Sequence, residues 1–141
     1  MTVDVLKRVA GRKVSAANVK RTAQKILRLV GQNNAELSLA LVGNDEIREL
    51  NRKYRNKPTP TDVLSFPADE SAGLHARLLG DVIISVEQAE VQARRARRTL
   101  VAEVEWLLIH GILHLLGYDH ERSAKEAKIM RALEKKITRA L

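Results

Sequence analysis

Four short stretches of the chain have the pattern or composition of β-strands. In two of them apolar and polar residues alternate, as expected for a strand with one buried face. The predicted strands cover residues 2–6, 37–41, 62–66 and 81–86. The last reads Asp-Val-Ile-Ile-Ser-Val and is almost continuously apolar, so it is predicted to lie in the centre of the sheet.

Five further stretches repeat apolar residues at helical spacing, and a residue suited to an N-cap precedes each of them. The predicted N-caps are Ser15, Asn44 or Asp45, Ser85, Thr99 and Ser123. Ser85 and Ser123 are each followed, three residues later, by Gln or Glu, which is the spacing of a capping box. Helix starts are therefore marked along the whole chain.

Two stretches show neither the alternation of a strand nor the apolar spacing of a helix, and they are predicted to be loops. Residues 55–61 contain two prolines, and residues 68–78 are polar, with His75 as an ordinary exposed histidine. Helices at both ends and strands between them favour an α+β fold. We predict a single domain over residues 1–141, with a small mixed β-sheet of about four strands covered by about five helices.

Composition narrows the class of protein. The 141 residues suffice to bury a core without covalent cross-links, and the absence of cysteine excludes a disulfide framework and a thiolate metal site. The N-terminus, Met-Thr-Val-Asp-Val-Leu-Lys-Arg, lacks the apolar core of a secretory signal. No stretch approaches the roughly 18 apolar residues of a membrane span. We therefore expect a cytoplasmic protein without a membrane partner.

The most informative stretch is His110-Gly-Ile-Leu-His114-Leu-Leu-Gly117-Tyr-Asp-His120. His110 and His114 are four residues apart, so on a helix both imidazoles leave the same face, one turn above the other. Gly117 can adopt the left-handed conformation that ends a helix, which would let His120 turn back toward the first two. The pattern predicts that the three imidazoles meet, with the last supplied by the turn that follows the helix.

Three imidazole ligands with an open fourth position are the arrangement of a catalytic zinc site. We predict one zinc ion per chain, bound by His110, His114 and His120. Nickel, copper and iron also accept imidazole ligands, so the ligand type alone leaves them open. The alternative without a metal is a set of packed, hydrogen-bonded histidines in the core.

The same spacing occurs in the metzincin peptidases, whose signature is H-E-x-x-H-x-x-G-x-x-H. In those enzymes the Glu after the first His is the general base. Gly111 stands at that position here. The metal ligands of a peptidase are therefore present without its base, and a different chemistry or a different base is required.

Basic residues form three clusters that point to a polyanionic partner. The net charge is +8 and the isoelectric point is near 10.1. The clusters are Lys7, Arg8, Arg12, Lys13, Lys20, Arg21, Lys25 and Arg28; Arg94, Arg95, Arg97 and Arg98; and Arg122, Lys125, Lys128, Arg131, Lys135, Lys136 and Arg139. Each cluster alone can be a solvated helix face. Together with a hydrolytic metal centre they favour RNA, although basic composition does not separate RNA from DNA or acidic protein.

The histidine stretch, with Thr61-Asp-Val-Leu-Ser-Phe-Pro67 and Leu79-Gly-Asp-Val-Ile-Ile-Ser85, resembles the YbeY family of bacterial ribosomal-RNA maturation factors. The resemblance extends from about Val42 to about Leu133. It implies a zinc-dependent, single-strand-specific endoribonuclease that acts in maturation of the 16S 3′ end and in ribosome quality control. The implied partners are single-stranded RNA and the small ribosomal subunit.

The resemblance also implies roles for individual residues. Arg55 stands at the family's Arg position and would stabilise the extra negative charge of a phosphodiester transition state; without the resemblance it would be a loop arginine in a surface ion pair. Asp119 owes its predicted role to its position directly before His120 and not to the resemblance: it would either orient a ligand imidazole or transfer a proton. Ser65 and Asp81 would hydrogen-bond backbone below the zinc or contact RNA. Asp62 stands where the family has Asp or Asn, which argues against an essential charge.

Two rival functions follow from the same residues. A metallopeptidase is supported by the metzincin spacing and opposed by Gly111. A non-catalytic RNA-binding ribosome assembly factor would use zinc only to fasten the C-terminal turn. The endoribonuclease predicts RNA cleavage, the metallopeptidase predicts peptide cleavage, and the assembly factor predicts neither.

Overall fold

The computed structural model of the chain describes residues 1–10, 14–68 and 77–141. The described residues form β1 (Thr2–Lys7), α1 (Ala16–Leu29), β2 (Glu36–Val42), α2 (Asn44–Arg55), β3 (Val63–Pro67), β4 (Leu78–Ser85), α3 (Val86–Ala96), α4 (Leu100–Leu115) and α5 (Ala124–Ala140). The predicted α+β fold, with a small mixed sheet and helices around it, is confirmed. His75 lies outside the described residues.

The sheet has the strand order β1-β2-β4-β3. β1, β2 and β4 are parallel, and β3 runs antiparallel to β4, with Ser65 opposite Val82. The apolar run at residues 81–86 falls mainly in β4, which lies between β2 and β3, so its prediction as a central strand is correct. A parallel pair needs a crossover, and α1 supplies it between β1 and β2.

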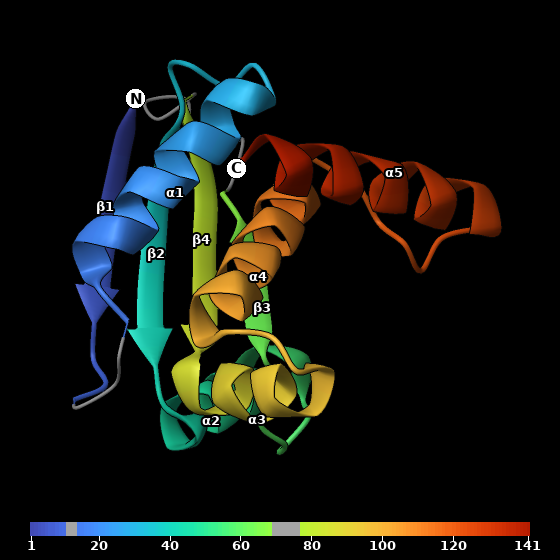
Figure 1. The fold of residues 1–141 in the computed structure, drawn as a ribbon. Helices are drawn as coiled ribbons and strands as arrows, with labels where there is room; N and C mark the ends of the chain where they lie inside the picture. The colour runs from blue at the N-terminus through green and yellow to red at the C-terminus, as the bar shows by residue number, and fades with distance from the viewer. Residues whose placement is uncertain (11–13, 69–76) are drawn as a thin grey trace.

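Helices α1 and α4 lie against the same face of the sheet, and α5 packs on α4 and extends past it (Figure 1). The main core forms between this layer and the sheet, with Leu37, Leu41 and Ile84 contributed by strands and fully buried. A smaller cluster lies on the opposite face, where Ile47 of α2 packs with Leu64 of β3. In the described part of the chain, no helix has the length and apolar composition needed to cross a bilayer.

Local capping explains where most helices begin. Ser15, Ser85, Thr99 and Ser123 each accept a hydrogen bond from the backbone N–H three residues later, at 3.1–3.2 Å. Each bond satisfies one of the N–H groups that lack a partner at a helix start. Four of the five predicted N-caps are therefore confirmed.

The start and end of α2 differ from the prediction. Its N-cap is Gly43, and Asn44 lies in the first turn. Asn44 Oδ1 accepts a hydrogen bond from Ser85 Oγ at 2.8 Å, and the Asn44 N–H donates to Glu87 Oε1 at 2.9 Å. A side chain from α3 thus caps the start of α2.

The end of α2 also differs from the prediction. The helix includes Arg55, predicted to lie in a loop, and its C-cap is Asn56, in the left-handed conformation with φ 57°. Arg55 is therefore held by a helix.

Candidate metal centre

Helix α4 brings the first two histidines together. Its apolar residues pack on the sheet and on α1, and Leu108, Ile109 and Ile112 are fully buried. The side chains of His110 and His114 leave the helix on another face and remain partly exposed. Their rings are 4.6 Å apart between centroids, and the two Nε2 atoms are 3.1 Å apart. The predicted helical spacing therefore gives a pair of imidazole nitrogens aimed at one point.

The turn after α4 brings His120 to the same place. Gly117 has φ 98°, a conformation that glycine adopts at little cost. The N–H of Gly117 donates to His114 O at 3.0 Å, and the N–H of Tyr118 donates to Leu113 O at 3.1 Å. These bonds reverse the chain, so the His120 ring lies 5.3 Å from that of His110 and 5.4 Å from that of His114.

The three imidazoles fit a metal ion. One nitrogen from each of His110, His114 and His120 lies within 4.8 Å of the others, so the group could hold a metal. Two nitrogens bound to zinc at about 2.0–2.1 Å lie roughly 3.3–3.4 Å apart at the tetrahedral angle. The His110–His114 pair, at 3.1 Å, needs only a small adjustment.

A buried carboxylate fixes one of these rings. Glu134 of α5 is only 3% exposed, and its Oε1 lies 3.2 Å from His110 Nδ1. An Nδ1–H that donates to this carboxylate leaves Nε2 as the free lone pair, which is the tautomer that a metal ligand needs. The Glu134–His110 contact thus orients the ring and selects its proton position.

Burial also favours the neutral form of His114. Desolvation is the main reason that the pKa of His114 is lowered, and the nearby His110, His120 and Arg55 act in the same direction. Asp119 partly opposes this effect. Since only a neutral imidazole binds a metal, the lowered pKa keeps His114 available as a ligand at neutral pH.

At Gly111, α4 packs tightly against the sheet. A Cβ at residue 111 would lie 2.7 Å from Val82 Cγ1 and 3.3 Å from Ser65 Oγ. Ser65 Oγ donates a hydrogen bond to Gly111 O at 3.2 Å. The position that carries the general base in metzincins therefore faces the packed sheet, and it has no room for a side chain.

The histidines open into a hollow of about 360 Å³ that also contains the two residues proposed for catalysis. Arg55 lines it from the end of α2, and Asp119 lines it from the turn before His120. Arg55 is exposed and makes no ion pair with any described carboxylate, unlike its neighbour Arg52, which pairs with Glu49. The structure therefore places beside the three histidines a guanidinium that pairs with none of the described carboxylates.

The bonds of Asp119 belong to the turn. Its Oδ1 accepts from the Glu121 N–H at 2.9 Å, and its Oδ2 lies 3.6 Å from Arg122 Nε. This arrangement shapes the loop that carries His120. Whether Asp119 also transfers a proton or orients an imidazole during the reaction stays a prediction.

Three other residues from the family motifs have different positions. Ser65 and Asp62 line the hollow. Asp62 is engaged on both oxygens, with the Val63 N–H at 2.8 Å and Gln92 Nε2 at 3.1 Å. Asp81 belongs to the opposite face of the sheet, because neighbouring residues of a strand alternate and Val82 faces Gly111. Burial raises the pKa of Asp81 there.

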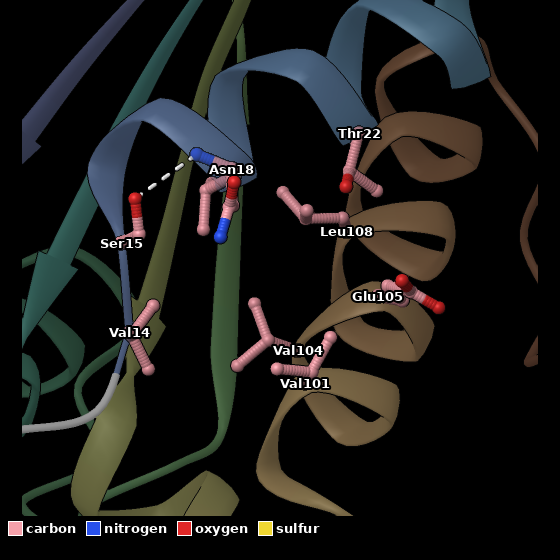
Figure 2. Close-up of a pocket in the computed structure, with 9 residues that line it drawn as sticks. Val14, Ser15, Asn18, Thr22, Val101, Val104, Glu105 and Leu108 are labelled. Atoms are coloured by element: carbon pink, nitrogen blue, oxygen red, sulfur yellow. Dashed lines mark hydrogen bonds between the residues drawn. The ribbon is translucent and has the colours of Figure 1, made fainter.

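Another hollow, of about 340 Å³, lies between α1 and the first half of α4 (Figure 2). Val14, Val104 and Leu108 supply much of its wall, and Ser15 is engaged in capping α1. It shares no residue with the histidine hollow and has a single carboxylate, Glu105, among its lining residues. It therefore offers no comparable group of metal ligands.

Known proteins are similar to this chain over almost its whole length. The family model described as "Endoribonuclease YbeY" matches residues 5–141. The chain belongs to the YbeY family. The resemblance that the histidine, Thr61–Pro67 and Leu79–Ser85 stretches indicated is thereby confirmed.

Two curated YbeY relatives illustrate the similarity. Endoribonuclease YbeY of Sulfurihydrogenibium sp. (strain YO3AOP1) is 50% identical over 131 residues, which cover 93% of this chain and 86% of that protein. Endoribonuclease YbeY of Aquifex aeolicus (strain VF5) is 47% identical over 141 residues, which cover 97% and 93%. Among solved structures, the solution structure of TM1509 from Thermotoga maritima has a TM-score of 0.68 at 33% identity, covering 97% of this chain and 87% of that one.

In this YbeY-family chain, Glu134 is the site residue that sequence reasoning missed. Its signal was present, because Met130, Glu134 and Ile137 occur at helical spacing and all three are buried. A carboxylate within an apolar stripe requires a buried partner. The same reasoning applies to Glu103, buried in α4, which pairs with Arg98 at 2.8 Å and so takes one arginine from the second basic cluster.

Proposed function

We propose that the chain is a zinc-dependent endoribonuclease that cuts single-stranded RNA. The observation that carries this proposal is the combination, in one open hollow, of three imidazole nitrogens and the Arg55 guanidinium, which has no ion-pair partner among the described residues. Membership of the YbeY family supports it, since the relatives are named endoribonucleases. Zinc is the metal we infer, because three neutral imidazoles with an open position are typical of catalytic zinc.

In this proposal the histidines, Arg55 and Glu134 have different roles. His110, His114 and His120 would hold the metal, which when bound supplies Lewis acidity and lowers the pKa of water. The guanidinium of Arg55 would bind non-bridging phosphate oxygens, whose negative charge grows in the transition state. Glu134 holds the His110 ring. The protein thus contributes a fixed metal site and a fixed cation to a reaction that adds charge to phosphorus.

We further propose that the RNA is ribosomal, since the family resemblance implies maturation of the 16S 3′ end and ribosome quality control on the small subunit. Exposed basic residues of α5, among them Lys128, Arg131 and Lys135, suit a large polyanion. In this proposal residues 1–141 work as one catalytic domain in the cytoplasm. RNA affinity would fall as salt is added, because bound phosphates release counterions.

The geometry at Gly111 weighs against the peptidase alternative. A peptidase of this type delivers a proton to the leaving amine through a carboxylate next to the first histidine. Here that position points at Val82 and carries no side chain. The assembly-factor alternative gives no role to the Arg55 guanidinium that lines the same hollow as the histidines.

An assay that compares three substrates tests the proposal. Zinc-loaded protein is incubated with a labelled single-stranded RNA, the same RNA annealed to its complement, and an unstructured peptide. We expect cleavage of the single strand alone, loss of cleavage with a chelator, and recovery on adding zinc. Peptide turnover would support the metallopeptidase instead, and binding of RNA without cleavage would support the assembly factor.

The Glu134–His110 contact leads to a separate prediction. Glu134→Ala removes the acceptor that orients His110, and losses of this kind typically weaken metal binding by about 10- to 100-fold. We expect zinc affinity, measured by competition with a chromophoric chelator, to fall in that range. Glu134→Gln should lose less, because an amide oxygen still accepts from Nδ1–H. Equal zinc affinity in wild type and Glu134→Ala would contradict the orienting role.

A further inference from the structure

A third hollow, distinct from the one between α1 and α4, adjoins the three histidines on the side of α5. It has a volume of about 420 Å³ and lies between α4 and α5. It shares Asp62, His110 and His120 with the hollow that contains Arg55. A strand of RNA that reaches the histidines from one hollow can therefore continue into the other without leaving the surface.

One aromatic side chain, Trp106, lines this third hollow. Trp106, one turn before His110 on α4, is half-buried and lines it, and Leu107, Ala127 and Met130 add apolar contacts. The Trp106 ring centroid is 6.4 Å from that of His110, and the two planes are inclined by only 31°. Trp106 is not among the residues that could hold the metal. A large aromatic ring left partly open beside a catalytic centre is suited to stacking on a flat ligand.

The charges around the hollow suit an anionic ligand. Arg131 of α5 lines it, is exposed, and makes no ion pair with any described carboxylate. The carboxylates of Asp62 and Glu134, which also line it, already accept hydrogen bonds from Gln92 and contact His110. A cation is thus free to bind a phosphate while the nearby acids are committed to the protein.

We propose that this hollow is a nucleobase subsite, in which one unpaired base of the RNA stacks on Trp106 and its phosphate contacts Arg131. The inference rests on the proposed ribonuclease function and adds the way in which the substrate is held. A base inside a duplex has both faces covered by its neighbours, so only a base turned out of a stack can enter. Stacking at this position gives a physical reason for preferring single strands.

The chain provides its own reporter, because Trp106 is its only tryptophan. Zinc-loaded wild-type protein is mixed in a stopped-flow instrument with a short single-stranded RNA, and fluorescence is read before cleavage. We expect saturable quenching with the single strand and none with the same RNA in a duplex. An RNA with abasic sites should bind without quenching.

Variants provide the second measurement. Loss of base stacking should weaken binding of labelled single-stranded RNA roughly 5- to 100-fold in Trp106→Ala, and Trp106→Phe should recover most of it. Arg131→Ala should reduce the salt slope of binding by about one. Val101→Ala is the matched control. Val101 is an exposed apolar residue of α4 that lines the hollow between α1 and α4, so this variant should bind RNA as wild type does.

The outcomes separate this subsite from the function on which it rests. If wild-type protein binds and cuts RNA but Trp106 fluorescence is unchanged and Trp106→Ala binds equally well, the subsite is wrong and the ribonuclease proposal stands. If the protein neither binds nor cuts RNA, both fail. Quenching by an aromatic peptide and not by RNA would assign the hollow to a protein ligand and overturn the proposal.

Discussion

His114→Ala protein is expected to purify without zinc and to leave single-stranded RNA intact. His114 supplies one of three nitrogens, and its Nε2 is the one that lies 3.1 Å from that of His110. Two imidazoles alone bind zinc far more weakly than three, and His120 sits on an exposed turn that gives limited support. We expect zinc per chain, measured by elemental analysis, to fall from about one to near zero, and cleavage to fall to background.

The substitution should spare the fold, because alanine is the best helix former and His114 is only half-buried. Circular dichroism and thermal melting check this point. His75→Ala is the control, since His75 lies outside the histidine motif. Zinc retained at the wild-type level in His114→Ala would remove the proposed metal centre.

Arg55→Ala is expected to lower the rate of RNA cleavage by about 10²- to 10³-fold while zinc content stays normal. This is the usual loss when a donor that stabilises transition-state charge is removed. Arg55 is exposed at the end of α2 and takes no part in the core, so stability should change little. The measurement is single-turnover cleavage at saturating protein, which separates the chemical step from binding.

A neighbouring arginine gives a matched control. Arg52 lies on the same helix but pairs with Glu49 and is absent from the hollow. Arg52→Ala therefore removes the same charge without removing the proposed catalytic contact, and it should cleave at nearly the wild-type rate. Equal rates for Arg55→Ala and wild type would return Arg55 to the role of a surface residue.

Features set by neighbouring residues were predictable from sequence. Ser15, Ser85, Thr99 and Ser123 cap helices because the acceptor and the N–H that it binds are three residues apart. The meeting of the three histidines has the same origin, since one helix and one turn bring them together. Their meeting point depends on the helical repeat and on Gly117, both of which are visible in the sequence.

Features that depend on distant packing were not predictable in this way. Asn44 cannot cap α2 because Ser85 and Glu87, about forty residues away, take its side chain and its N–H. Glu134 reaches His110 only because α5 folds back on α4. Trp106 has the spacing of a core residue, and only the packing of α5 shows that it borders a hollow at the metal centre.

The close contact at Gly111 determines what it would take to introduce a metzincin-type glutamate at this position. A side chain at residue 111 would have to move Val82, fully buried in β4, or push α4 outward by roughly 1 Å to reach ordinary contact distance. Because His110 directly precedes Gly111 on that helix, an outward shift of α4 would also move a proposed metal ligand. A glutamate at residue 111 would therefore need either a smaller residue at position 82 or a shift of α4 that moves His110. We therefore expect the sizes of residues 82 and 111 to be correlated among related chains, with a larger residue at 111 accompanied by a smaller one at 82.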